Sequence, residues 1–244
     1  MNQFTKLAAL SFCTALTPVT PVLANAETTA LMEEIFSVMW GAAGTADVGE
    51  TDDAARSTRW SDVTISNGDE GVIINLPWID VSKKMLGGYV VTMAPKMTMT
   101  GELPDGEGQI SGEIVQQGME MNVTGSRGDR VIDVSIGQVD ATIKMGDLVD
   151  MTMVMKNGVG QIEINDDILS GTFEYPMMDI QYGINVEGQK TQTSVELTGT
   201  KGDYRSPVLR GQDIGAWAEL WAAGSEFFVN YNADAMTMKM TAAS

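Results

Sequence analysis

The sequence predicts a mainly β protein: a curved antiparallel sheet or open β-barrel, a taco-like meander, with an N-terminal helix and one short helix near the C-terminus. Three observations carry this prediction. Apolar and polar residues alternate with period two in many segments between Trp60 and Thr200. Turn-forming residues such as Asn67-Gly68 separate these segments. Helical spacing of apolar residues is confined to residues 27–44 and 212–224.

The first residues have the pattern of an export signal. Residues 1–26 contain one cation, Lys6, followed by an apolar run over residues 7–16. The run is too short to span a bilayer. Ala24-Asn25-Ala26 fits the small-x-small pattern of a signal-peptidase site. We therefore expect cleavage between Ala26 and Glu27, export to the periplasm of a Gram-negative cell, and a mature protein that does not span the membrane.

The mature chain, residues 27–244, is expected to form a single β-rich domain that opens with an amphipathic helix over residues 27–44. Thr28 or Thr29 can cap this helix, and Leu31, Met32 and Ile35 fall on one face with Met39. Residues 45–59 are polar, acidic and without a period, so we interpret them as a linker.

The β-meander is expected over residues 60–200. The candidate strands are residues 60–66, 71–76, 89–103, 109–116, 119–125, 130–137, 138–145, 150–156, 160–164, 171–175, 179–186 and 193–200. The candidate turns are Asn67-Gly68, Pro104-Asp105-Gly106, Arg127-Gly128-Asp129, Asn157-Gly158, Glu187-Gly188 and Gly202-Asp203.

The C-terminal segment combines the second helix with a strand. Asp213 is a candidate N-cap for the helix over residues 212–224, and a strand pattern then runs over residues 225–244. Because the chain stops inside a strand pattern, we expect either an edge strand or a chain that continues in a longer, full-length protein.

Composition excludes several function classes. The chain has no histidine, and its one cysteine, Cys13, lies in the leader, so catalysis by Ser-His-Asp or Cys-His systems is excluded. The net charge of −18 becomes −19 when Lys6 leaves with the leader, which opposes binding to nucleic-acid phosphates. No Gly-rich phosphate loop or nucleophile elbow is visible. We expect no enzyme and no cofactor, and the composition does not predict an oligomeric state.

Methionine recurs at every second position in four places. The candidate ligand-groove residues are Met97, Met99, Met119, Met121, Met151, Met153, Met155, Met236, Met238 and Met240. Alternate residues lie on one face of a strand, so each group would present its thioethers together. They can fill a core, line a groove for acyl chains, or bind Cu(I) as soft ligands, for which Met151, Met153 and Met155 are the candidates.

The leader, the helix ending near Trp40, the M-x-M strands and the segment AWAELWAAGSEFFVNYNADAMTMKM together resemble an alphaproteobacterial family, domain of unknown function 2125 (DUF2125). The resemblance implies a place in the cell envelope and kinship with the long curved sheets of lipid-handling envelope proteins. The leading hypothesis is a non-enzymatic periplasmic protein that binds an apolar or lipid-like ligand or acts as an envelope scaffold. Cu(I) binding through the M-x-M motifs and a carboxylate-dependent hydrolase remain alternatives.

Overall fold

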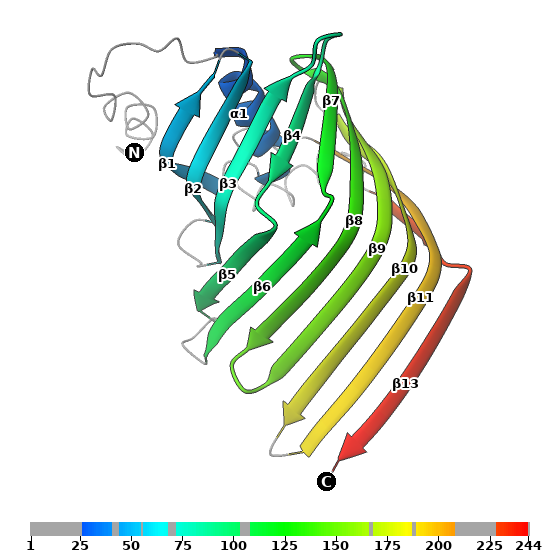
Figure 1. Ribbon diagram of the computed structural model, residues 1–244. Helices are drawn as coiled ribbons and strands as arrows, with labels where there is room; N and C mark the ends of the chain where they lie inside the picture. Colours follow the sequence, from blue (N-terminus) through cyan, green and yellow to red (C-terminus); the bar gives the residue numbers. More distant parts are fainter. Residues whose placement is uncertain are drawn as a thin grey trace, which may run out of the picture.

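The computed structural model describes residues 26–40, 44–54, 56–67, 72–102, 108–165, 168–186, 189–207 and 228–243. Within these ranges the chain forms one helix and one antiparallel sheet of 13 strands (Figure 1). The predicted mainly β fold with a helix near the N-terminus is confirmed. The predicted helix at residues 212–224 lies outside the described residues, as do residues 1–25 of the leader.

The helix α1 spans Ala26–Trp40. The strands are β1 (Gly44–Asp53), β2 (Ser57–Asn67), β3 (Ile73–Lys83), β4 (Tyr89–Met93), β5 (Lys96–Glu102), β6 (Gln109–Gln117), β7 (Glu120–Ser126), β8 (Asp129–Met145), β9 (Val149–Asn165), β10 (Ile168–Val186), β11 (Gln189–Pro207), β12 (Phe228–Asn232) and β13 (Ala235–Ala243).

The sheet has two halves that share its long strands. In the upper half of Figure 1, β3 is followed by β4, β7 and β8, and β12 pairs with β11 at the edge. In the lower half, β3 is followed by β5, β6 and β8, and β13 takes the edge position beside β11. Strands β9 and β10 run through both halves, as β2 and β8 do.

A line of exceptional residues, which we call the crease, separates the two halves. In the strand registers each of these residues lies opposite or close to the next: Gly49, Asp62, Pro77, Pro95, Gly118, Gly137, Asn157, Pro176, Gly199 and Asp234. Asp62 and Asn157 have φ values of 52° and 53°, and they are the non-glycine residues with positive φ in the described ranges. Ladder pairing is interrupted along this line, for example between the pairs Ile136–Gly158 and Gln138–Lys156.

The crease shifts the alternation of side chains by one residue. In an uninterrupted strand, residues two apart share a face. Across the crease the buried residues are instead three apart, as in Trp60 and Val63 of β2 and in Leu76 and Ile79 of β3. These four side chains belong to one core cluster, so the apolar face stays on the same side of the sheet. Kinks and bulges of this kind give a sheet its curvature.

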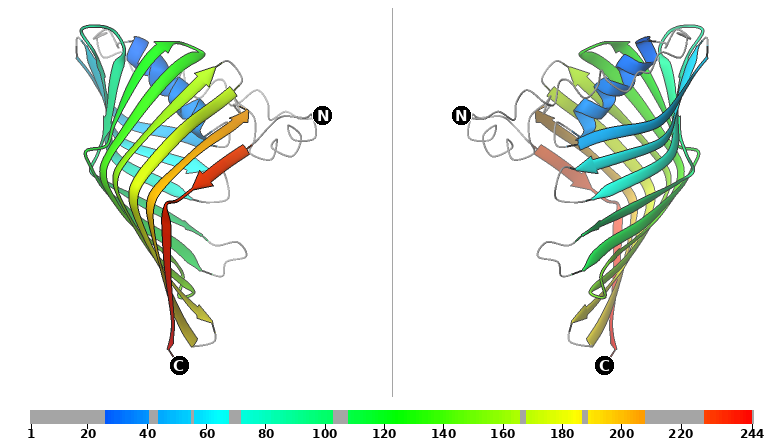
Figure 2. Two further views of the ribbon diagram at one scale, coloured as in Figure 1. Left: turned by 90° about the vertical axis from the view of Figure 1, so that its right-hand side faces the viewer. Right: turned by 90° about the vertical axis from the view of Figure 1, so that its left-hand side faces the viewer.

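The core lies between α1 and the concave face of the sheet, which curves around the helix (Figure 2). Leu31, Met32 and Ile35 of α1 pack against a cluster drawn from β2, β3, β4, β7, β8 and β9. This amphipathic face is the one predicted for residues 27–44, although the helix ends at Trp40. Among the described residues, no helix has the length and hydropathy needed to cross a bilayer.

A buried ion pair fixes α1 to the turn between β7 and β8. The Glu34 carboxylate accepts a hydrogen bond from the Gly128 amide (2.7 Å) and another from Nε of Arg130 (3.2 Å). Arg130 also donates to the Gly125 carbonyl (2.7 Å). The Glu34 and Arg130 side chains are only 7% and 10% exposed, so removing one partner would leave a buried charge, at a cost of about 3–5 kcal/mol.

Two predictions about strands and turns are wrong for one reason. Asn157-Gly158 lies inside β9 and Gly202-Asp203 lies inside β11, and neither is a hairpin turn. Strands β8, β9 and β10 each join two segments that the sequence predicted separately. In the sequence the crease looks like the end of a strand, because glycine, proline or asparagine stands where the alternation of apolar and polar residues changes. By contrast, the predicted turn at Arg127-Gly128-Asp129 is confirmed.

The predicted linker over residues 45–59 is also wrong, because this segment forms β1 and the start of β2. Ala46 and Val48 pack against the core, and the crease at Gly49 interrupts their alternation. β1 pairs only with β2 and is an edge strand. Charged residues are a common protection of edge strands, which explains the acidic composition. The predicted terminal strand over residues 225–244 is likewise two strands, β12 and β13, divided at the crease.

The left-handed conformation at Gly199 gives a test of the crease. Its φ is 61°, and a Cβ there would overlap the Asp234 carboxylate. We expect Gly199→Ala to lower the free energy of unfolding by about 1–2 kcal/mol or more, from backbone strain and steric overlap. Gly183→Ala is the matched control, because its φ lies outside the left-handed region and a Cβ would meet nothing closer than 3.9 Å. Urea unfolding measures the stability of the two variants. Equal unfolding midpoints for Gly199→Ala and Gly183→Ala would contradict a structural requirement for glycine at position 199.

Candidate functional site

The lower half of the sheet presents an apolar face that crosses every strand. The strand registers align its side chains in rows perpendicular to the strands. One row consists of Leu76, Met97, Ile114, Ala141, Met153, Ile180, Val195 and Met238. At a strand spacing of about 4.8 Å, seven steps from β3 to β13 give this row a length of roughly 34 Å.

The rows on either side are also rich in methionine. Toward the crease lie the buried polar residue Gln116 and then Val139, Met155, Met178, Leu197 and Met236. Away from the crease lie Ile74, Met99, Gly112, Ile143, Met151, Tyr182, Thr193 and Met240. We call these three rows together the methionine face.

The methionine face is only partly covered. Helix α1 makes most of its contacts with β1, β2 and β3 and reaches the start of β8 through Glu34. Figure 2 shows the helix over the upper half of the sheet, and no other described helix or strand lies over the face from β5 to β13. Met99, Met151, Met153 and Met155 are partly buried by their neighbours. Exposure rises toward the β13 edge, where Met238 is 49% exposed and Met236 and Met240 are each 62% exposed. The methionines of the face are therefore partly or largely exposed, whereas the smaller apolar residues between them are buried, at 5–8% exposure for Leu76, Val139, Ala141 and Leu197.

The ten methionines predicted as groove residues fall into two groups. Met121 is 6% exposed inside the core, and Met119 packs against that core from the crease. Met121 therefore lies in the filled core rather than in an open groove, and Met119 lies at the border of that core. The other eight lie on the methionine face, with Met97 at its border with the core.

Sequence reasoning missed several members of the face. Met178 lies directly opposite Met155, and Ile180 and Tyr182 continue the same strand face. Met178 is not part of an M-x-M motif, because the residues two positions away are Pro176 and Ile180. A search for apolar alternation without regard to residue type would have found Met178, Ile180 and Tyr182 as one set.

An aromatic cluster borders the methionine face beyond the crease. The Phe173 and Tyr175 rings are 5.6 Å apart and tilted by 37°. Tyr175 and Tyr204 cover glycines: a Cβ at Gly158 or at Gly171 would lie 2.7 Å from the respective ring. Burial raises the pKa of both tyrosine hydroxyls, and the neighbouring Tyr175 adds to the shift at Tyr204. Rings over glycines stabilise a bent sheet, so this cluster has a structural role.

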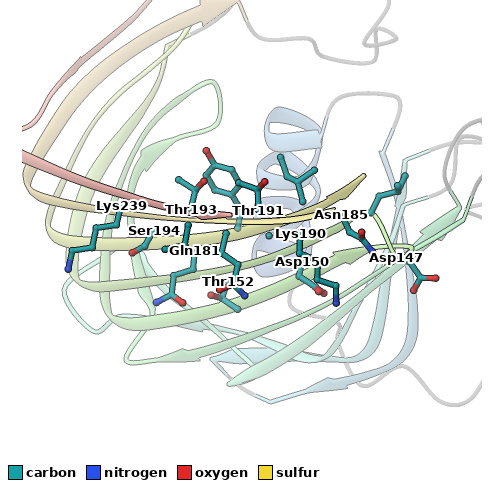
Figure 3. A pocket seen from close by; sticks show the side chains of 16 residues that line it. Asp147, Asp150, Thr152, Gln181, Asn185, Lys190, Thr191, Thr193, Ser194 and Lys239 are labelled. Atoms are coloured by element: carbon teal, nitrogen blue, oxygen red, sulfur yellow. The ribbon is translucent and has the colours of Figure 1, made fainter. Parts of the chain in front are cut away.

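The opposite face of the lower half is polar. A hollow of about 450 Å³ lies near the strand ends, lined mostly by residues of the polar face and also by Tyr182 and Thr193 of the methionine face. In Figure 3, Gln181, Thr152 and Ser194 point to one side of the sheet, whereas Thr191 and Thr193 point to the other. Charges of both signs line the hollow, from Asp147, Asp150, Lys190 and Lys239. The two faces of the same strands therefore differ: one presents mostly apolar side chains, and the other presents polar and charged side chains.

Metal and acid–base chemistry were the other possibilities raised by the sequence. The described residues contain no group of three or more Asp, Glu, His or Cys that could hold a metal ion. Met151, Met153 and Met155 do share one face, and Met178 adds a thioether beside Met155. Glu34, the buried carboxylate of the described core, has both oxygens bound to Gly128 and Arg130.

Searches of protein-family models, of curated proteins and of solved structures find no match to this chain.

Replacing Met151, Met153 and Met155 together with leucine separates packing from metal binding. Leucine nearly conserves volume and apolarity, and each such swap usually costs less than about 1.5 kcal/mol. We expect the triple variant to fold and to show unchanged affinity for Cu(I), measured by competition with a Cu(I) chelator. Tight Cu(I) binding by the wild type that is lost in the variant would instead assign the face to metal, because leucine offers no lone pair.

Proposed function

We propose that the protein binds an apolar or lipid-like ligand on the methionine face and acts without catalysing a reaction on it. The observation that supports this most is the continuity of the face: three rows of mostly apolar side chains cross the lower half, and the methionines in these rows remain partly exposed to water. A contiguous exposed apolar surface of this kind on a water-exposed protein marks an interaction or ligand-binding site.

The residue type favours a ligand of variable shape. Leucine, isoleucine and valine would serve an ordinary sheet face, and the core under α1 uses them. Methionine has three rotatable bonds and a polarisable sulfur, so it adapts to contents that vary. Apolar surface removed from water contributes about 25 cal/mol per Å², and this term would supply the affinity for an acyl chain laid along a row.

We propose the periplasm as the place of action, on the strength of the export pattern in residues 1–26. An envelope location is also what membership of domain of unknown function 2125, proposed from the sequence alone, would imply. In that compartment an open apolar face can meet acyl chains, and the net charge of −19 that remains after loss of the leader opposes non-specific aggregation.

The two faces of β9 supply a test with a matched control. Met153 lies on the methionine face, and Thr152 beside it lies on the polar face. We expect an environment-sensitive fluorescent fatty acid to bind the wild-type protein, and Met153→Lys to weaken that binding by about tenfold or more, because an ammonium group in an apolar row must be desolvated. Thr152→Lys adds the same charge and should leave the affinity unchanged.

Absence of probe binding to the folded wild type would contradict the proposal. Equal losses of probe affinity in Met153→Lys and Thr152→Lys would contradict it as well. Such a result would show that the added charge weakens binding wherever it is placed, and not only on the methionine face. Native mass spectrometry of protein isolated from the periplasm, with lipid extraction, identifies what the face carries: a co-purifying lipid supports the proposal, and a copper adduct supports the metal alternative.

A further inference from the structure

The sheet has one edge that is unusually apolar. β12 and β13 pair only with β11, so in the described chain no strand lies on their outer side. Five large apolar side chains follow one another along this edge: Val229 (56% exposed), Tyr231 (49%), Met236 (62%), Met238 (49%) and Met240 (62%). A long, exposed apolar edge strand is a template for pairing with another strand.

Strand β13 itself also lacks negative charge, and the nearest carboxylate in the sequence, Asp234, lies before it at the crease. Between Ala235 and Ala243 the single charged residue is Lys239. The opposite edge strand, β1, carries Asp47, Glu50, Asp52 and Asp53. Because the whole chain has a net charge of −18, two copies repel each other over most of their surface. The β13 edge is the edge at which a second copy meets no carboxylate on the facing strand.

We infer that β13 pairs with β13 of a second copy, antiparallel and centred on Met238, so that the two sheets join into one. This inference goes beyond the proposed ligand binding. A two-fold axis makes the contact self-complementary, with the same surface on both copies. In this register Met236 lies opposite Met240 of the second copy, and the two Met238 side chains face each other. The methionine faces of the two copies then form one continuous surface.

The same register matches charges on the polar face. Lys239 of the second copy lies opposite Thr237, and Thr237 pairs with Glu196 on β11. Lys239 and Glu196 from different copies are thus two strand spacings apart, about 9.6 Å between Cα atoms, which lies within the combined reach of the two side chains. Both side chains are exposed, and the two-fold axis creates this ion pair twice.

The test is sedimentation velocity of the wild type and of charge-reversed variants over a micromolar concentration range. We expect the wild type to dimerise. Glu196→Lys and Lys239→Glu each place like charges together at both ion-pair positions, so each should weaken dimerisation by roughly tenfold. The double variant restores opposite charges and should recover most of the affinity. Both residues are exposed, so the variants should fold, which circular dichroism verifies.

Lys156→Glu is the control for net charge. Lys156 is exposed on β9, away from the β13 edge, and its reversal changes the charge of the chain by the same amount as Lys239→Glu. We expect its dimerisation to match the wild type. A wild type that stays monomeric throughout the range would overturn the inference. A dimer that is equally sensitive to Lys156→Glu and Lys239→Glu, or one that the double variant does not restore, would also overturn it.

Discussion

The structure depends on the alternation of side chains along each strand. Where the sheet bends at the crease, its apolar face stays on one side only if neighbouring strands shift their alternation at the same place. Gly118, Gly137 and Asn157 make this shift in neighbouring strands, and Pro176 and Gly199 continue it. A strand that failed to shift would turn its methionines or its isoleucines toward the polar face. The curvature around α1 and the continuity of the apolar face therefore have the same origin.

The sequence was sufficient for the fold class, the first helix and most strand positions, because period-two alternation is a local signal. It was not sufficient for strand length. Asn157-Gly158 has the composition of a hairpin turn, and only its pairing to β8 and β10 on both sides shows that the strand continues. The sequence nevertheless contains a signal that the strand continues. Apolar residues three apart, such as Ile136 and Val139, indicate that the alternation shifts by one residue within a strand.

The candidate site was predictable in residue type and only partly in position. Alternation placed Met151, Met153 and Met155 together on one face. Whether a methionine lies in the filled core or on the methionine face depends on where α1 ends and on which strands it covers, and this is a tertiary property. Met121 and Met153 look alike in sequence, yet Met121 belongs to the core cluster that includes the helix residues, and Met153 lies on the partly exposed face. The acidic β1 shows the same limit, because edge strands and linkers share a polar composition.

The central claim is that the apolar face continues beyond the helix and is open to water. Methionine oxidation by hydrogen peroxide, followed by peptide mass spectrometry, measures this residue by residue in the folded protein, because the reaction requires access to sulfur. The account predicts that Met151, Met153 and Met155 oxidise well before Met32 and Met121, and that an added fatty acid slows only the first group. Equal protection of Met153 and Met121 in the ligand-free protein would contradict it.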